Sequence, residues 1–236
     1  MLVKPEGQGA LLITQQAHAF VSGQLARAWG NERVVPPEPF REVCLAAEQH
    51  DLGMASFDMN PTLNPETGFP HSFMEMPLDT HLEIWTEAPL RMLAQDRYAA
   101  MLVALHGIAL YERRNLDSLA PADAARVQAF IQTQRSFVDE IAAELGVGAD
   151  ERERNQRLIW TFDSLSLALL LGWDPFEVHG LERRGWTLDP WPFREDRLEL
   201  RCDARRLERG APLTDARWEK VSVVLRARPS RDRVVD

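Results

Sequence analysis

The segment 158–173, "LIWTFDSLSLALLLGW", limits most strongly how this chain can fold. It is apolar on nearly every face at the helical period, so we expect a helix that is buried among other helices. Asp163 stands within it, and a buried carboxylate without a partner costs several kcal/mol or takes up a proton. Asp163 therefore predicts a cation, a metal ion or hydrogen-bond donors inside the fold.

Helical patterns fill most of the remaining chain. We expect Thr14 to cap the first helix, Gly53 to end the second as a C′ glycine, and Asp150 to cap the last. Pro121 fits the first turn of the fifth helix. The expected helices cover residues 14–28, 40–51, 79–94, 96–114, 120–145 and 151–172.

The C-terminal part differs from the rest. The stretches "RLELRCDARRL" and "KVSVVLRAR" alternate as strands do. We therefore expect a mainly α protein, with a helical bundle over residues 1–185 and a small β-rich appendage and basic tail over residues 186–236. Residues 201–236 carry 10 Lys or Arg and 6 Asp or Glu, a net charge of +4. This segment is either a solvated arginine-rich tail or a contact to an anionic partner.

Composition excludes several classes of protein. The chain has 236 residues, of which 45% are hydrophobic, and a formal net charge of −9, so bulk attraction to nucleic acid is not expected. Cys44 and Cys202 lie far apart and predict no disulfide framework. The longest apolar stretch is too short to span a bilayer, and we expect a soluble cytoplasmic protein without a membrane partner. The "PWPF" motif and the terminal strands predict either a homodimer contact or a flap packed on the body.

Polar residues in metal-capable combinations occur on the expected helices. His18 and His106 lie in apolar helical segments, the adjacent His50 and Asp51 end another helix, and Asp163 lies in a fourth. A neutral imidazole and a carboxylate suit a divalent metal such as Mn, Fe, Zn or Ni. If these residues meet at one point, each buried polar side chain gains a partner there, so the pattern predicts a metal site.

A purely structural interpretation predicts no bound metal. In it, Asp163 pairs with Arg27 or Arg41, and the histidines are ordinary core residues.

The order of His18, His50-Asp51 and Asp163 on successive helices resembles the HD-domain metal-dependent phosphohydrolase superfamily. The resemblance covers about residues 11–175, and the wider text, such as "AAEQHDLGMASFD", looks like a bacterial family related to HD proteins. It implies an HD-domain-like helical bundle in which these four residues ligate a divalent transition metal. His81 and His106 lie in the interval where many members place histidines that hold a second metal or meet the substrate phosphate. Met54 departs from the pattern, because many HD hydrolases have a lysine there.

The resemblance implies a metal-dependent phosphohydrolase that acts on a nucleotide or another small phosphoester, with one or two metal ions. His81 and His106 are the expected catalytic residues, either as ligands of a second metal or as the general acid. The loop 57–77 could line the pocket, with His71 and Arg97 as phosphate contacts. Glu48 is either a residue that orients a ligand or a surface glutamate. Two alternatives remain open: a non-catalytic metal-binding regulatory protein with an HD-like fold, and a di-iron oxygenase of HD type.

Overall fold

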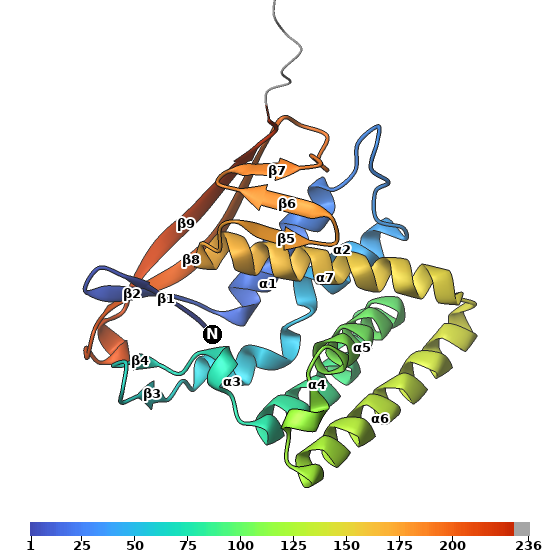
Figure 1. Ribbon diagram of the computed structural model, residues 1–236, viewed down its shortest axis with the longest axis horizontal. Coiled ribbons are helices and arrows are strands. Elements are labelled where there is room, and N and C mark those ends of the chain that lie inside the picture. The colour runs from blue at the N-terminus through green and yellow to red at the C-terminus, as the bar shows by residue number, and fades with distance from the viewer. Residues whose placement is uncertain (229–236) are drawn as a thin grey trace, which may run out of the picture.

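A computed structural model describes residues 1–228 and shows helices packed against a curled sheet (Figure 1). The helical patterns in the sequence placed the long helices correctly. Thr14 is confirmed as the cap of the first one, since its side chain accepts a hydrogen bond from the Ala17 amide at 3.1 Å. The helices are α1 Gln15–Ala28, α2 Phe40–Gln49, α3 Ala55–Met59, α4 Leu78–Met92, α5 Arg97–Glu112, α6 Pro121–Leu145 and α7 Ala149–Leu171.

Two expected helix boundaries are wrong. Gly148 occupies the N-cap of α7, and Asp150 lies in the first turn instead of capping the helix. Gly53 does not end α2, because it lies within the short 3₁₀ helix Leu52–Met54 that follows. A Cβ at Gly53 would lie 2.9 Å from the carbonyl oxygen of Ile84 in α4, so the glycine permits a close approach of two segments.

The expected mainly α fold with a small β-rich appendage is wrong, because a seven-stranded curled sheet is a major part of the structure. Helices contain 53% of the residues and strands contain 21%. The strand order is β1-β2-β8-β9-β7-β6-β5, and the neighbours are antiparallel except β7 and β9. The strands of the sheet are β1 Leu2–Glu6, β2 Gly9–Ile13, β5 Phe176–Val178, β6 Leu181–Arg184, β7 Thr187–Asp189, β8 Arg197–Glu208 and β9 Arg217–Arg226; a separate hairpin joins β3 Leu63–Asn64 to β4 Phe69–Pro70.

The N-terminal hairpin explains much of this difference. Strand β2 is buried along its whole length, so its sequence "GALLI" is a short apolar run without the alternation of a half-exposed strand. It pairs with β8, with Gly9 opposite Glu208 and Leu12 opposite Arg205. The sheet therefore joins strands from both ends of the described chain.

Helix α1 connects the sheet to the helical layer. Leu200, Cys202 and Ala204 are buried on one face of β8, whereas Arg201 and Asp203 on the other face are exposed. The side-chain amide of Gln24 in α1 donates to the Arg201 carbonyl at 2.7 Å and accepts from the Arg201 amide at 3.0 Å. Because α1 also contacts α2 and α7, its inner face lies between the sheet and the other helices.

The close packing of α1 on α2 depends on Gly23. A Cβ at this position would lie 2.6 Å from the Cβ of Glu48, a distance that real Cβ atoms essentially never show. The glycine lets α1 and α2, the two helices that carry His18 and His50, come close together.

The segment that contains "PWPF" packs on the body of the protein. Phe193 is buried, and its ring lies edge to face with Trp29, with 5.9 Å between the ring centroids. Within residues 1–228, no helix is long and apolar enough to cross a membrane. The end of the expected basic tail, residues 229–236, lies outside the described residues.

Candidate metal centre

Five of the six predicted site residues lie together inside the helical layer. His18 projects from α1, His50 and Asp51 lie at the end of α2, His106 lies on α5 and Asp163 lies on α7. All five are buried; His18 and His50 are each 1% exposed. Four helices that are separate in sequence thus place their polar residues around one point, and only His81 lies outside this group.

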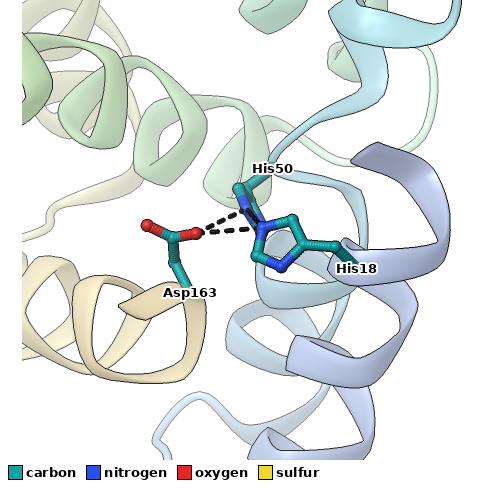
Figure 2. A group of neighbouring side chains, drawn as sticks. All are labelled: His18, His50 and Asp163. Atoms are coloured by element: carbon teal, nitrogen blue, oxygen red, sulfur yellow. Dashed lines mark hydrogen bonds and ion pairs between the residues drawn. The ribbon is translucent and has the colours of Figure 1, made fainter. Parts of the chain in front are cut away.

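Three of these side chains form the tightest group (Figure 2). The Nε2 atoms of His18 and His50 are 3.2 Å apart. The Oδ1 atom of Asp163 lies 3.0 Å from Nε2 of His18 and 3.4 Å from Nε2 of His50. Each residue therefore turns one ligand atom toward the other two.

The hydrogen-bond partner of Nδ1 determines the tautomer of His50. Its Nδ1 lies 2.8 Å from the carbonyl oxygen of Ala47. A carbonyl oxygen can only accept, so Nδ1 carries the hydrogen and donates it. In neutral His50 the lone pair is therefore on Nε2, which faces the centre.

Ser166 has the same effect on His18. The Ser166 hydroxyl donates to the backbone carbonyl oxygen of Asp163 at 2.8 Å. Its oxygen therefore accepts from Nδ1–H of His18 at 2.6 Å. Ser22 adds a further hydrogen bond to the Ser166 hydroxyl at 2.9 Å. The lone pair of neutral His18 is then on Nε2 too, and a hydrogen bond from the second ring nitrogen is typical of histidines that ligate metals.

This arrangement requires positive charge at its centre. Two imidazole lone pairs and the Asp163 carboxylate face one another in a buried space, and they repel unless a proton or a metal ion lies between them. Burial alone would lower the pKa of His50, but the carboxylates of Asp51 and Asp163 outweigh it and raise that pKa to about 9. Burial raises the pKa of Asp163, but hydrogen bonds from His18 and His50 outweigh it and hold that pKa well below its usual range.

The geometry fits a divalent transition metal. Nitrogen and carboxylate ligands lie about 2.0–2.2 Å from zinc, which separates neighbouring ligand atoms by about 2.8–3.6 Å at tetrahedral or octahedral angles. The three distances among His18, His50 and Asp163 all fall in this range. Two imidazoles and one carboxylate also suit Mn, Fe, Ni or Zn better than Ca or Mg, which prefer oxygen ligands.

Asp51 approaches the two imidazoles but not Asp163. Its Oδ2 atom lies 3.4 Å from Nε2 of His18 and 3.5 Å from Nε2 of His50. The group of ligand atoms that all lie within 4.8 Å of one another contains His18, His50 and Asp163, without Asp51. Burial raises the pKa of Asp51, the two imidazoles oppose this, and the Asp163 carboxylate adds to it. Asp51 thus adds negative charge beside the two rings, while the other three residues form the compact donor set.

His106 lies beside the second oxygen of Asp163. Its Nε2 is 3.6 Å from Oδ2 of Asp163, and its ring centroid is 5.1 Å from that of His50. Its Nδ1 is buried without a hydrogen-bond partner in the described part of the chain. Burial lowers the pKa of His106 to about 3, so the ring is neutral near pH 7. The nearby carboxylate favours the tautomer with hydrogen on Nε2, which makes His106 a neutral donor directed at the centre.

His81 lies away from this point and uses both ring nitrogens elsewhere. Its Nε2 accepts from the indole N–H of Trp85 at 3.2 Å, so its Nδ1–H donates to the hydroxyl of Tyr111. Burial, followed by the charge of Arg114, lowers the pKa of His81 to about 4. The ring centroids of Trp85 and His106 are 5.4 Å apart, so Trp85 lies between His81 and the centre.

The other residues named from the sequence lie outside the centre. Arg97 forms an exposed ion pair with Glu144 at 2.7 Å. Arg97 and His106 are nine residues apart on α5, which is about 14 Å along the helix. His71 is half-buried, and its Nδ1 lies 3.8 Å from Oε2 of Glu75.

The alternative partners for Asp163 are also accounted for. Arg27 pairs with Glu48, and Arg41 is exposed, while Asp163 contacts imidazoles. Met54, at the position of the lysine in many HD hydrolases, is buried.

Ser166 is the residue of the candidate centre that was not expected from the sequence. A serine three residues after Asp163, in an otherwise apolar helix, is the signal that could have indicated it. Residues three apart on a helix share a face, so a hydroxyl there lies next to the carboxylate.

Comparison with protein families matches residues 1–209 to the family described as "Protein of unknown function (DUF3891)". Neither the search of curated proteins nor the search of solved structures found a significant match.

Proposed function

The chain belongs to the DUF3891 family, and we propose that this member is a metal-dependent phosphohydrolase acting on a small phosphoester, as the resemblance of its sequence to HD-domain proteins implies. The observation that carries the proposal is the convergence of His18, His50 and Asp163 with both imidazole lone pairs facing inward. Three protein ligands leave coordination positions free for water and substrate, as catalytic metal sites do.

Each residue of the centre has a distinct task in this proposal. His18, His50 and Asp163 would hold one divalent transition metal. When bound, such a metal activates water and polarises a phosphoryl oxygen. Ser166 and the Ala47 carbonyl keep the two rings in the orientation and tautomer that expose Nε2.

His106 serves as a hydrogen-bond donor in this proposal. A ring whose pKa burial lowers to about 3 carries no extra proton near pH 7, so it is a poor general acid. Its neutral N–H can stabilise negative charge on a phosphoryl oxygen without transferring a proton. His81, with both nitrogens engaged by Tyr111 and Trp85, supports Trp85 against His106.

A non-catalytic metal-binding role is the second candidate, and the depth of the centre favours it. His18 and His50 are each 1% exposed, and Asp163 is 7% exposed, so a substrate has little access in this conformation. Metal binding is common to both candidates, and only hydrolysis separates them.

The decisive experiment measures metal content and phosphoester hydrolysis in the same samples. Protein loaded with Mn, Fe, Ni or Zn is analysed for metal and assayed with nucleotides and small phosphoesters. The unmodified chain is compared with Asp163→Asn and with Asp150→Asn, a matched change at an exposed position of α7. We expect about one ion per chain, lost only in Asp163→Asn together with hydrolysis.

The outcomes separate the candidates clearly. Metal that binds through Asp163 without hydrolysis of any phosphoester would favour the regulatory role. Absence of metal in all three proteins after reconstitution would overturn both. Two ions per chain with oxygen-dependent chemistry would favour the di-iron alternative instead.

A further inference from the structure

Two arginines lie beside the metal centre on the side where Trp160 covers His106. The Trp160 ring centroid is 5.7 Å from that of His106, and the guanidinium carbon of Arg113 lies 3.8 Å from the Trp160 ring centroid. Trp160 is half-buried, whereas Arg113 is exposed. The series His106, Trp160 and Arg113 therefore leads from the buried centre to the surface.

Arg157 lies on the same face of α7 as Trp160. It lies one turn before Trp160, and its carbonyl accepts from the Thr161 hydroxyl at 2.8 Å. That hydroxyl in turn accepts from Nδ1–H of His179 at 3.0 Å. His179 belongs to the β5–β6 turn, which lies on one side of α7 while α5 lies on the other (Figure 1).

Arg157, Trp160 and Thr161 share one face of α7 because they are three and four residues apart. On this face Arg113 stacks over Trp160, and Thr161 contacts His179. Both arginines also act on the pKa of His179. Burial lowers its pKa first, and the charges of Arg157 and Arg113 lower it further.

The backbone at His179 is unusual for a histidine. His179 and Gly180 both have positive φ, of 50° and 80°, as the central residues of a type I′ turn have. Asn-Gly is the ordinary choice there, and a histidine is tolerated at a modest cost. The turn places this ring against Thr161, next to the two arginines.

Neither arginine is neutralised within the described chain. Arg113 donates a hydrogen bond to the Ala109 carbonyl at 3.3 Å, and neither it nor Arg157 has a carboxylate within ion-pair distance among residues 1–228. The protein as a whole carries a charge of −9, so a local pair of unneutralised cations beside the centre is a place that favours an anion.

We propose that Arg113 and Arg157 bind a second anionic group of the substrate, a phosphate, while the phosphoester to be cleaved lies at His18, His50 and Asp163. The substrate class is then a small bisphosphorylated molecule. This inference rests on the proposed function, because it assigns the substrate of the same centre. Guanidinium groups suit phosphate because their planar donors pair with its oxygens.

The test compares the binding of two probes to the metal-loaded full chain by calorimetry. The probes are fructose 1,6-bisphosphate and fructose 6-phosphate, which differ by one phosphate. The variants are Arg113→Gln, Arg157→Gln and Arg113→Lys, with Arg217→Gln as a control that removes an exposed arginine from β9. Metal content and thermal unfolding confirm that each variant is folded and loaded.

We expect the bisphosphate to bind at least about tenfold more tightly than the monophosphate. Arg113→Gln and Arg157→Gln should each remove most of this advantage, Arg113→Lys part of it, and Arg217→Gln none. Equal binding of the two probes, or an advantage that survives both glutamine variants, would overturn the inference.

Failure of the proposed function looks different from failure of this inference. If no phosphoester is hydrolysed but the two arginines still control the bisphosphate advantage, the anion site stands and the hydrolase proposal fails. If hydrolysis depends on Asp163 but bisphosphate binding ignores both arginines, the hydrolase proposal stands and the anion site fails.

Discussion

The Nε2 atoms of His18 and His50 lie 3.2 Å apart in a buried space, while each ring already uses its Nδ1 hydrogen for a bond to another group. The Nε2 lone pairs of two neutral imidazoles in this orientation repel each other. A cation shared by both lone pairs removes this repulsion, and the Asp163 carboxylate beside both rings further favours positive charge there.

Ser166→Ala tests how the His18 ring is held. The change removes the oxygen that accepts Nδ1–H, so the ring can rotate and its Nε2 no longer points reliably at the centre. We expect metal affinity to fall about 10- to 100-fold, measured by competition with a chelator, while the helix content is unchanged. Ser164→Ala, two residues away on α7, is the control and should bind metal as the unmodified protein does. Unchanged affinity in Ser166→Ala would show that the serine has no part in the site.

Gly23→Ala tests the packing of α1 on α2. The new Cβ would collide with Glu48, so the helices must separate, and the distance between His18 and His50 must increase. We expect the free energy of unfolding to fall by about 1–3 kcal/mol in urea titrations, with weaker metal binding. Gly148→Ala is the matched control, since a Cβ at Gly148 meets nothing within 4 Å. Loss of stability without any change in metal affinity would mean that the centre tolerates movement of the helices.

The stability of the metal-free protein should depend on pH through His50. The carboxylates of Asp51 and Asp163 outweigh burial and raise the pKa of His50 to about 9 in the folded protein. A raised pKa of a base means that its stabilisation is fully present below the unfolded pKa, about 6.5, and is lost as pH rises through about 9. We therefore expect the metal-free protein to lose stability over this window. A bound metal takes the place of the proton, so the loaded protein should lose less.

Urea unfolding at the two ends of this window, with chelator and with metal, measures the difference. Burial raises the pKa of the Cys44 and Cys202 thiols to about 11, and both thiols are present in both forms, so their contribution cancels. An equal loss of stability with and without metal would contradict a cation shared by the two rings.

His81→Phe separates support from catalysis. It leaves the Tyr111 hydroxyl and the Trp85 indole N–H without their buried partner. We expect the free energy of unfolding to fall by about 1–3 kcal/mol for each orphaned group, with metal content unchanged. His71→Phe in the loop should change stability by no more than about 0.5 kcal/mol. Loss of metal in His81→Phe would instead place His81 among the ligands.

Part of the candidate site was predictable because its signals are local. An aspartate in the apolar helix α7 and a histidine in the apolar helix α5 each needed a partner, whatever the fold. The donor types also indicated a transition metal before any distance was known. The engagement of His81 by Tyr111 was not predictable, because the two residues lie on different helices and meet only when these pack. The separation of Asp51 from the Asp163 group has the same origin.

The sequence by itself determined where the long helices lie, since periodicity, caps such as Thr14 and the apolar faces depend on residues that are near one another in the chain. The tertiary structure alone decided the sheet, because β2 is a short apolar run whose pairing with β8 joins residues almost 200 positions apart. It also decided the candidate metal centre, because the 3.2 Å between the Nε2 atoms of His18 and His50 requires α1 and α2 to pack closely, as they do at Gly23. Local patterns encode elements, whereas the convergence of atoms depends on which surfaces are buried against each other.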